Sequence, residues 1–205
     1  MKKKNGITNF ILLVILAILI IVAVVIVKIE EKNKQENPVE ETIKLRAIGY
    51  GSTIQKLGYT DAGTIINTFI NGYNEHSGES VASNMDFVGM YIYSACGDPQ
   101  KEFDDKYIEY MRSDSQIGME EMIILQNSAK QQEDGLVKGI NETNVQLEVL
   151  EYTEIEDISK YLSKFRAKIR TVSAEEGIDQ TDWVELWLLH NEKAYYIINY
   201  YNAGN

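Results

Sequence analysis

The chain opens with a long, uninterrupted run of apolar residues. Residues 7–27 carry no charge, and Thr8 and Asn9 are the only polar side chains among them. A helix of this length, at about 1.5 Å per residue, spans a hydrocarbon core of about 30 Å. Cleaved signal peptides usually have an apolar region of only about 7–15 residues, and no small-residue cleavage pattern precedes Lys28. The pattern therefore predicts a transmembrane anchor rather than a leader that is removed.

Further along the chain, apolar residues recur at helical spacing. A first amphipathic helix is predicted from Thr60, with Asp61 as a second capping candidate. A second helix is predicted over residues 78–97, and a third, shorter one from Asp98, where a proline follows the capping residue. The run 118–130 fits either a helix or a buried strand. The apolar positions of the first helix are Ile65, Ile66, Phe69, Ile70 and Tyr73.

After Asn141 the hydrophobic period changes to two, which is typical of strands. Candidate strands cover residues 145–149 and 161–169, and the last two, 183–190 and 195–201, flank a four-residue loop and predict a hairpin. Both faces of this hairpin carry apolar or aromatic side chains. One face must therefore pack on the helices, and the other must be covered or line a cavity.

Helices followed by antiparallel strands indicate an α+β domain, with helices packed on a curved sheet. We divide the chain into three parts: residues 1–27, the cytoplasmic tail and transmembrane helix; residues 28–59, a charged stalk and linker; and residues 60–205, the α+β domain. The stalk is assigned from its charges, from the few large apolar residues up to residue 44, and from Pro38.

Three segments of the chain resemble the cystatin-like, nuclear transport factor 2-like superfamily, in particular its membrane-anchored or lipoprotein members in Gram-positive bacteria. They are the helix TIINTFINGYNEHSG, the segment that ends in YIYSACG, and the closing strands DWVELWLLHNEKAYYIINYY. The resemblance covers roughly residues 60–205 and implies a cone, in which a long first helix packs across a strongly bent sheet and leaves a pocket. The superfamily includes isomerases, dehydratases, transport adaptors and secretion scaffolds, so the fold does not fix the chemistry.

The charge of the chain limits its partners and its orientation. The net charge is −11, and without the lysines at residues 2–4 the remaining 17 basic and 31 acidic residues give 17 − 31 = −14. A domain of this charge repels phosphate, which argues against nucleic acid as a partner. Three lysines lie on each side of the span, and the α-amino group favours a cytoplasmic tail. We therefore expect a single-pass protein of the cell membrane with its C-terminal domain outside the cytoplasm.

The sequence contains no pattern that identifies a catalytic or metal site. His76 and His190 are its only histidines, no partner lies at metal-ligand spacing, and the single Cys96 permits no internal disulfide. We therefore predict no cofactor, no metal and no catalytic residue. An isomerase-like site would need an Asp or Glu base opposite a tyrosine in an apolar pocket, and 13 tyrosines make such a pair possible without singling one out.

The candidate site residues are four aromatic residues of the closing hairpin: Trp183, Trp187, Tyr195 and Tyr201. They alternate along the strands and are predicted to share one face, either as part of the core, which we favour, or as a pocket or partner surface.

These observations favour an extracytoplasmic binding or scaffold protein on a membrane anchor, with an envelope protein or a small apolar ligand as its partner. The alternatives are an isomerase-like enzyme with an Asp/Glu and Tyr pair in the cone pocket, and an assembly factor of a secretion or conjugation machine.

Overall fold

The computed structural model describes residues 45–175, 177–191 and 194–203. The predicted span over residues 7–27 and the charged segment up to residue 44 lie outside this part of the chain. Among the residues that are described, none of the helices combines the length and the hydrophobicity that a membrane crossing requires.

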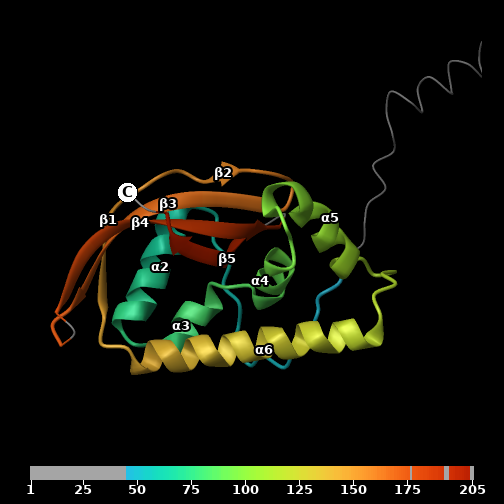
Figure 1. The fold of residues 1–205 in the computed structure, drawn as a ribbon, viewed down its shortest axis with the longest axis horizontal. Helices are drawn as coiled ribbons and strands as arrows, with labels where there is room; N and C mark the ends of the chain where they lie inside the picture. Colours follow the sequence, from blue (N-terminus) through green and yellow to red (C-terminus); the bar gives the residue numbers. More distant parts are fainter. Residues whose placement is uncertain (1–44, 176, 192–193, 204–205) are drawn as a thin grey trace, which may run out of the picture. The chain divides into compact units, whose positions relative to one another are not determined.

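The described part runs from helices to strands, which confirms the α+β class. The helices are α2 (Ala62–Asn74), α3 (Gly78–Ser83), α4 (Phe87–Ser94), α5 (Pro99–Met111) and α6 (Met119–Glu142). The strands are β1 (Gln146–Tyr152), β2 (Glu156–Asp157), β3 (Leu162–Ser173), β4 (Ile178–His190) and β5 (Tyr195–Asn202). They form one antiparallel sheet in the order β1-β3-β4-β5, and the short β2 pairs with β3. Figure 1 shows this sheet on one side of the domain and α6 along the other, with α3 and α4 between them.

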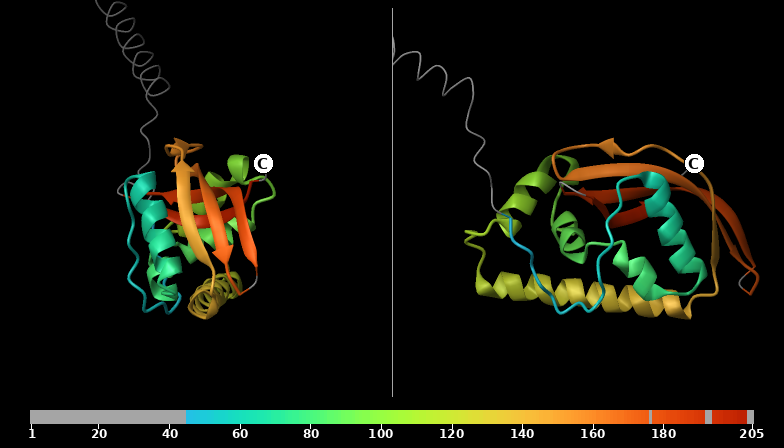
Figure 2. Two further views of the ribbon diagram at one scale, coloured as in Figure 1. Left: turned by 90° about the vertical axis from the view of Figure 1, so that its left-hand side faces the viewer. Right: turned by 180° about the vertical axis from the view of Figure 1, so that it is seen from behind.

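Helix α2 forms where its apolar stripe predicted it. Asp61 caps it, since one of its carboxylate oxygens accepts a hydrogen bond from Thr64 N at 2.7 Å. Ile65, Ile66 and Phe69 are buried on the face that packs on the sheet. In the end view of Figure 2 (left), α2 and the helices α4 and α5 lie at opposite sides of the domain.

The prediction of one helix over residues 78–97 is wrong, because the chain breaks between α3 and α4. Ile197 N donates to Asn84 O, and Asp86 N donates to Ile197 O, both at 2.9 Å. Met85, which is fully buried, thereby pairs with the edge of β5. A hydrogen-bonding partner more than 100 residues away in the sequence cannot be read from local periodicity.

The ambiguous run 118–130 is helical and belongs to α6, which has 24 residues and is the long helix of the described domain. Its buried residues Leu125, Ala129 and Ile140 face α3 and α4. The crossing with α3 is close: a Cβ at Gly78 would lie 2.3 Å from the carbonyl oxygen of Val137. The first helix, α2, has 13 residues and packs on β1, so the long first helix that the resemblance implies is not found here.

Residues 45–59, which we call the arm, lie within the linker expected from the sequence, but they pack on the domain. Ile48, Tyr50 and Ile54 are half-buried against the core, while Gly49 and Thr53 between them are exposed. Leu57 N donates to Ser83 O at 2.7 Å. Figure 2 (right) shows the arm passing over α6 before it reaches α2. Residues 45–59 therefore belong structurally with the domain that follows them.

Candidate partner-binding surface

Three of the four predicted aromatic residues share one face of the sheet. The register pairs Tyr201 with Glu185, which places Tyr201 on the same face as Trp183 and Trp187. We call this the outer face. The opposite, inner face carries Phe165 and is packed against the helices.

Tyr195 is the exception, and the prediction of a common face is wrong for it. Trp187 pairs with Asn199, whereas the next residue, Leu188, pairs with Ile197. Ile198 is therefore an extra residue on β5, and this β-bulge moves the rest of the strand to the opposite face. Strict alternation in the sequence could not reveal the bulge, because both strands are apolar on both faces.

Tyr195 instead contributes to a shallow cavity at the start of α2. Its ring stacks on His190, with centroids 4.4 Å apart, and its hydroxyl donates to Asp157 Oδ1 at 3.4 Å. Burial, together with the nearby Asp157 charge, raises the pKa of Tyr195. The cavity measures about 330 Å³ and is also lined by Tyr152 and Gly63. Tyr195 therefore belongs to a different surface from the other three aromatic residues.

The three aromatic residues of the outer face differ in burial. Trp187 is 2% exposed and packs on Tyr93 of α4, with ring centroids 5.6 Å apart. The core role that we favoured is therefore confirmed for Trp187. Trp183 is half-buried and Tyr201 is 45% exposed. These two remain available at the surface.

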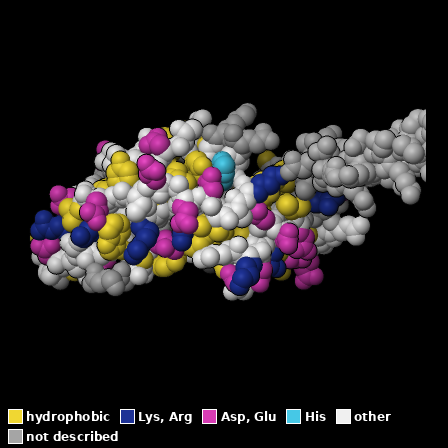
Figure 3. All heavy atoms as spheres, turned by 90° about the horizontal axis from the view of Figure 1, so that it is seen from above, with side chains coloured by type: hydrophobic (Ala, Val, Ile, Leu, Met, Phe, Trp, Pro, Cys, Tyr) yellow, Lys and Arg dark blue, Asp and Glu magenta, His cyan; other side chains and the backbone are white. Residues whose placement is uncertain are grey.

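The outer face also carries a row of cations that the sequence analysis missed. Lys164, Arg166, Lys168 and Arg170 alternate along β3, and we call them the basic stripe. Residues 160–170 hold five of the 20 Lys and Arg residues of the chain and no Asp or Glu. The signal that could have found the stripe is this alternation, K-x-R-x-K-x-R, in an otherwise acidic domain. Figure 3 views the molecule from above and shows basic, hydrophobic and acidic side chains interspersed on that side.

The two ends of the basic stripe are neutralised by ion pairs. Lys164 lies 3.7 Å from Glu156, and Arg170 donates through two nitrogens to Asp179, at 2.8 Å each. Glu148 lies 3.6 Å from the same guanidinium. The hydrogen bonds between Arg170 and Asp179 lower the pKa of that carboxyl.

The centre of the stripe packs on an indole instead. The guanidinium of Arg166 lies 5.1 Å from the ring centre of Trp183, and the Lys168 ammonium lies 6.0 Å from it. Neither side chain forms an ion pair with a carboxylate of the residues that the structure describes. Arg166 Nε is buried and has no hydrogen-bond partner. In the described residues, these two cations at the middle of the outer face therefore contact an indole and form no direct ion pair.

A second polar cluster lies between the arm and α6, centred on the buried Glu133. Its Oε2 accepts hydrogen bonds from the Tyr50 hydroxyl at 2.8 Å, the Ser52 hydroxyl at 2.7 Å and the Lys56 ammonium at 2.7 Å. Burial raises the pKa of Glu133, but the hydrogen bonds from Lys56, Ser52 and Tyr50 outweigh it and leave the pKa below its usual range. All three donors belong to the arm. Glu133 therefore fastens the arm to the domain.

The tyrosine and carboxylate pairs of the structure bear on an isomerase-like site. Tyr50 donates to Glu133, Tyr110 to Glu121, Tyr195 to Asp157 and Tyr201 to Glu185. In each pair the two groups bond to each other directly, instead of facing one another across an apolar cavity as an acid–base pair would around a substrate.

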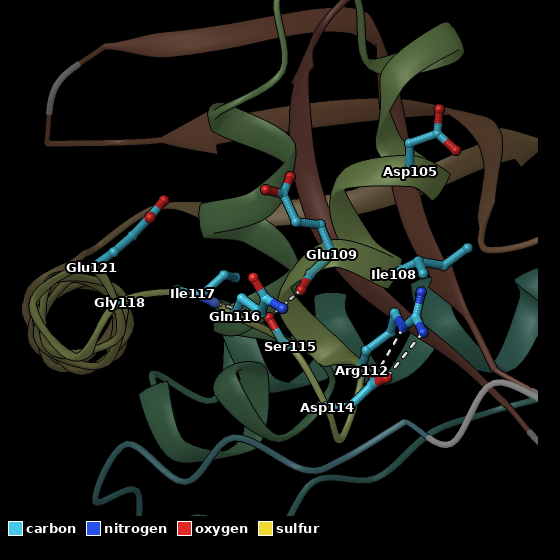
Figure 4. Close-up of a pocket in the computed structure, with 10 residues that line it drawn as sticks. All are labelled: Asp105, Ile108, Glu109, Arg112, Asp114, Ser115, Gln116, Ile117, Gly118 and Glu121. Atoms are coloured by element: carbon cyan, nitrogen blue, oxygen red, sulfur yellow. Dashed lines mark hydrogen bonds and ion pairs between the residues drawn. The ribbon is translucent and has the colours of Figure 1, made fainter.

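The α5–α6 corner encloses a cavity of about 600 Å³ that is lined mainly by polar and charged groups. Figure 4 shows Arg112 turned to Asp114, with Glu109 and Glu121 further along the wall. The Arg112 guanidinium donates to both Asp114 oxygens, at 3.0 and 3.1 Å. In the parts of the chain that are described, no group of three or more His, Cys, Asp or Glu residues could hold a metal ion.

No protein-family model, no curated protein and no solved structure matches this chain. The resemblance to the cystatin-like, nuclear transport factor 2-like superfamily therefore remains a prediction.

Proposed function

We propose that this chain is a single-pass membrane protein whose domain lies outside the cytoplasm and binds a partner protein through the outer face of its sheet. The proposal rests on one observation: Trp183, Tyr201 and the centre of the basic stripe remain at the surface of a sheet whose other face is packed. Tryptophan, tyrosine and arginine are the residue types that contribute most to protein interfaces.

The membrane part of the proposal is supported by the apolar run 7–27 and by the short charged segment that follows it in the sequence. Fewer than 20 residues, 28–44, lie between the predicted span and the first residue that the structure describes, and many of them are charged. A tether of this length keeps the domain close to the membrane surface.

Protease treatment of intact spheroplasts tests the orientation. We expect digestion of the chain beyond residue 44 without lysis. Digestion only after lysis would place the domain in the cytoplasm and overturn that part of the proposal.

Chemical crosslinking in whole cells tests the partner part. We expect a discrete adduct of the full chain that is lost in the outer-face variant Trp183→Ser/Tyr201→Ser. The matched control is Tyr152→Ser, because Tyr152 is 49% exposed but pairs with Ala167 on the inner side of the sheet. An adduct that survives in the outer-face variant, or the absence of any adduct, would contradict the proposal.

A further inference from the structure

We infer that the partner presents carboxylates to the centre of the basic stripe, on an extended acidic segment that lies along β3. This inference rests on the proposed function and names the chemistry of the partner. It is carried by Arg166 and Lys168, whose positions relative to Trp183 and to the surrounding carboxylates limit what can bind.

Arg166 and Lys168, at the centre of the basic stripe, are the cations of the stripe that can bind a partner's carboxylate. Lys164 and Arg170 are held by carboxylates of the same chain, whereas Arg166 and Lys168 pack on Trp183. An arriving carboxylate would form charge-assisted hydrogen bonds with both, and the planar guanidinium of Arg166 suits two-point binding. Trp183 beneath them adds apolar contact and holds the two cations in place.

The direction of the acidic segment follows from the acids on the neighbouring strands. Glu151 of β1 lies opposite Lys168, and Glu185 of β4 lies opposite Arg166. These carboxylates border the stripe on both sides and repel an acidic segment that crosses the sheet. A segment that runs along β3 keeps its charges over the cations.

The spacing of the stripe selects the pattern of the segment. Alternate residues of a strand lie about 6.6–6.8 Å apart, so carboxylates at every second residue of an extended peptide match Arg166 and Lys168. The net charge of −14 for the chain beyond residue 4 disfavours acidic partners elsewhere on the domain.

A labelled peptide of repeated Glu-Thr units, measured by fluorescence anisotropy with the full chain in detergent micelles at low ionic strength, tests the inference. We expect saturable binding that weakens with added salt, and a peptide of Gln-Thr repeats that does not bind. Arg166→Gln/Lys168→Gln should weaken the affinity about tenfold or more, about 1.4 kcal/mol.

Two controls keep the result interpretable. Lys101→Gln/Lys138→Gln removes the same charge from exposed helix positions and should leave the affinity within about twofold. Lys168→Arg keeps the charge and should retain binding, and an unchanged thermal melting transition of Arg166→Gln/Lys168→Gln shows that its loss of affinity is not caused by misfolding. Equal binding of the Gln-Thr peptide, or unchanged binding by Arg166→Gln/Lys168→Gln, would overturn the inference. If the cellular adduct depends on Trp183 and Tyr201 while the acidic peptide fails to bind, the proposed function stands and the acidic partner is wrong.

Discussion

The Lys56 ammonium lies 2.7 Å from Oε2 of Glu133, although the two residues are 77 positions apart. The Glu133 side chain is 1% exposed and that of Lys56 is 25% exposed. Lys56 also donates to Ala82 O at 3.1 Å and lies over the ring of Phe87. One ion pair thus joins the arm, α3, α4 and α6.

Replacing the carboxylate of this pair should loosen the arm. Glu133→Gln leaves the Lys56 charge without its partner, and we expect a loss of about 3 kcal/mol in the free energy of unfolding, because broken buried pairs are strongly destabilising. Chemical denaturation of the full chain in detergent micelles measures it. Asp134→Asn is the matched control, since Asp134 forms an exposed pair with Lys130 and should change stability by less than about 0.5 kcal/mol. Equal losses of unfolding free energy in the two variants would contradict the conclusion that Glu133 holds the arm on the domain.

The pH dependence of that loss has a definite sign. The pKa of Glu133 is lower in the folded state than its ordinary value, so its contribution is present above the unfolded pKa and disappears as the pH falls through the folded pKa. The difference in the free energy of unfolding between the wild-type chain and Glu133→Gln should therefore be largest near neutral pH and should decrease in acid.

For Asp86 we expect the opposite dependence of stability on pH. Burial raises its pKa, although Gly89 N donates to its carboxylate at 2.7 Å as the cap of α4. A raised folded pKa stabilises the protein at low pH, and this contribution is lost as the pH rises through it. Asp86→Asn keeps a good capping residue without the charge, so it should stabilise the domain at pH 8 by about 0.5–1 kcal/mol. Denaturation at several pH values should show this advantage vanishing in acid, and destabilisation at pH 8 would contradict the account.

Two aspartates that precede helices should differ in importance. Asp61 accepts a hydrogen bond from Thr64 N, whereas the side chain of Asp98 makes no capping bond to α5. Asp61→Ala should cost about 1 kcal/mol of unfolding free energy, and Asp98→Ala less than about 0.5 kcal/mol. Equal effects would mean that the capping bond contributes nothing measurable.

Substitutions of the two tryptophans of β4 should differ in their effect on stability, because Trp187 lies in the core and Trp183 lies at the surface. Trp187→Ala opens a cavity next to Tyr93 and should cost about 3–5 kcal/mol. Trp183→Ala removes a half-buried ring and should cost about 1 kcal/mol. Thermal melting of both variants checks the difference, and an unshifted transition for Trp187→Ala would overturn its assignment to the core.

The spacing of apolar residues predicted those helices and strands that form independently of contacts with distant segments of the chain. The one-sided apolar stripe of α2 and the closing hairpin of β4 and β5 are such cases, and both form. The break at Met85 and the bulge at Ile198 were missed, because each depends on a contact with another element.

The candidate site was predicted in part for the same reason. Trp183, Trp187 and Tyr201 share one face because the pairing of β4 with β5 is regular near Glu185. Tyr195 lies on the opposite face because the bulge at Ile198 comes between it and Tyr201. The basic stripe was visible in the sequence as alternating cations. Whether these cations can bind a partner depends on which carboxylates lie next to them on the neighbouring strands. The order of the strands in the sheet determines this, and it cannot be read from the sequence.

The most direct test of the central claim is site-specific photocrosslinking in living cells, with a photoreactive phenylalanine analogue at Tyr201 or at Tyr152. Both positions are similarly exposed, at 45% and 49%, but only Tyr201 lies on the outer face. The account predicts a discrete protein adduct from Tyr201 and none from Tyr152. No adduct from Tyr201, or the same adduct from both positions, would contradict it.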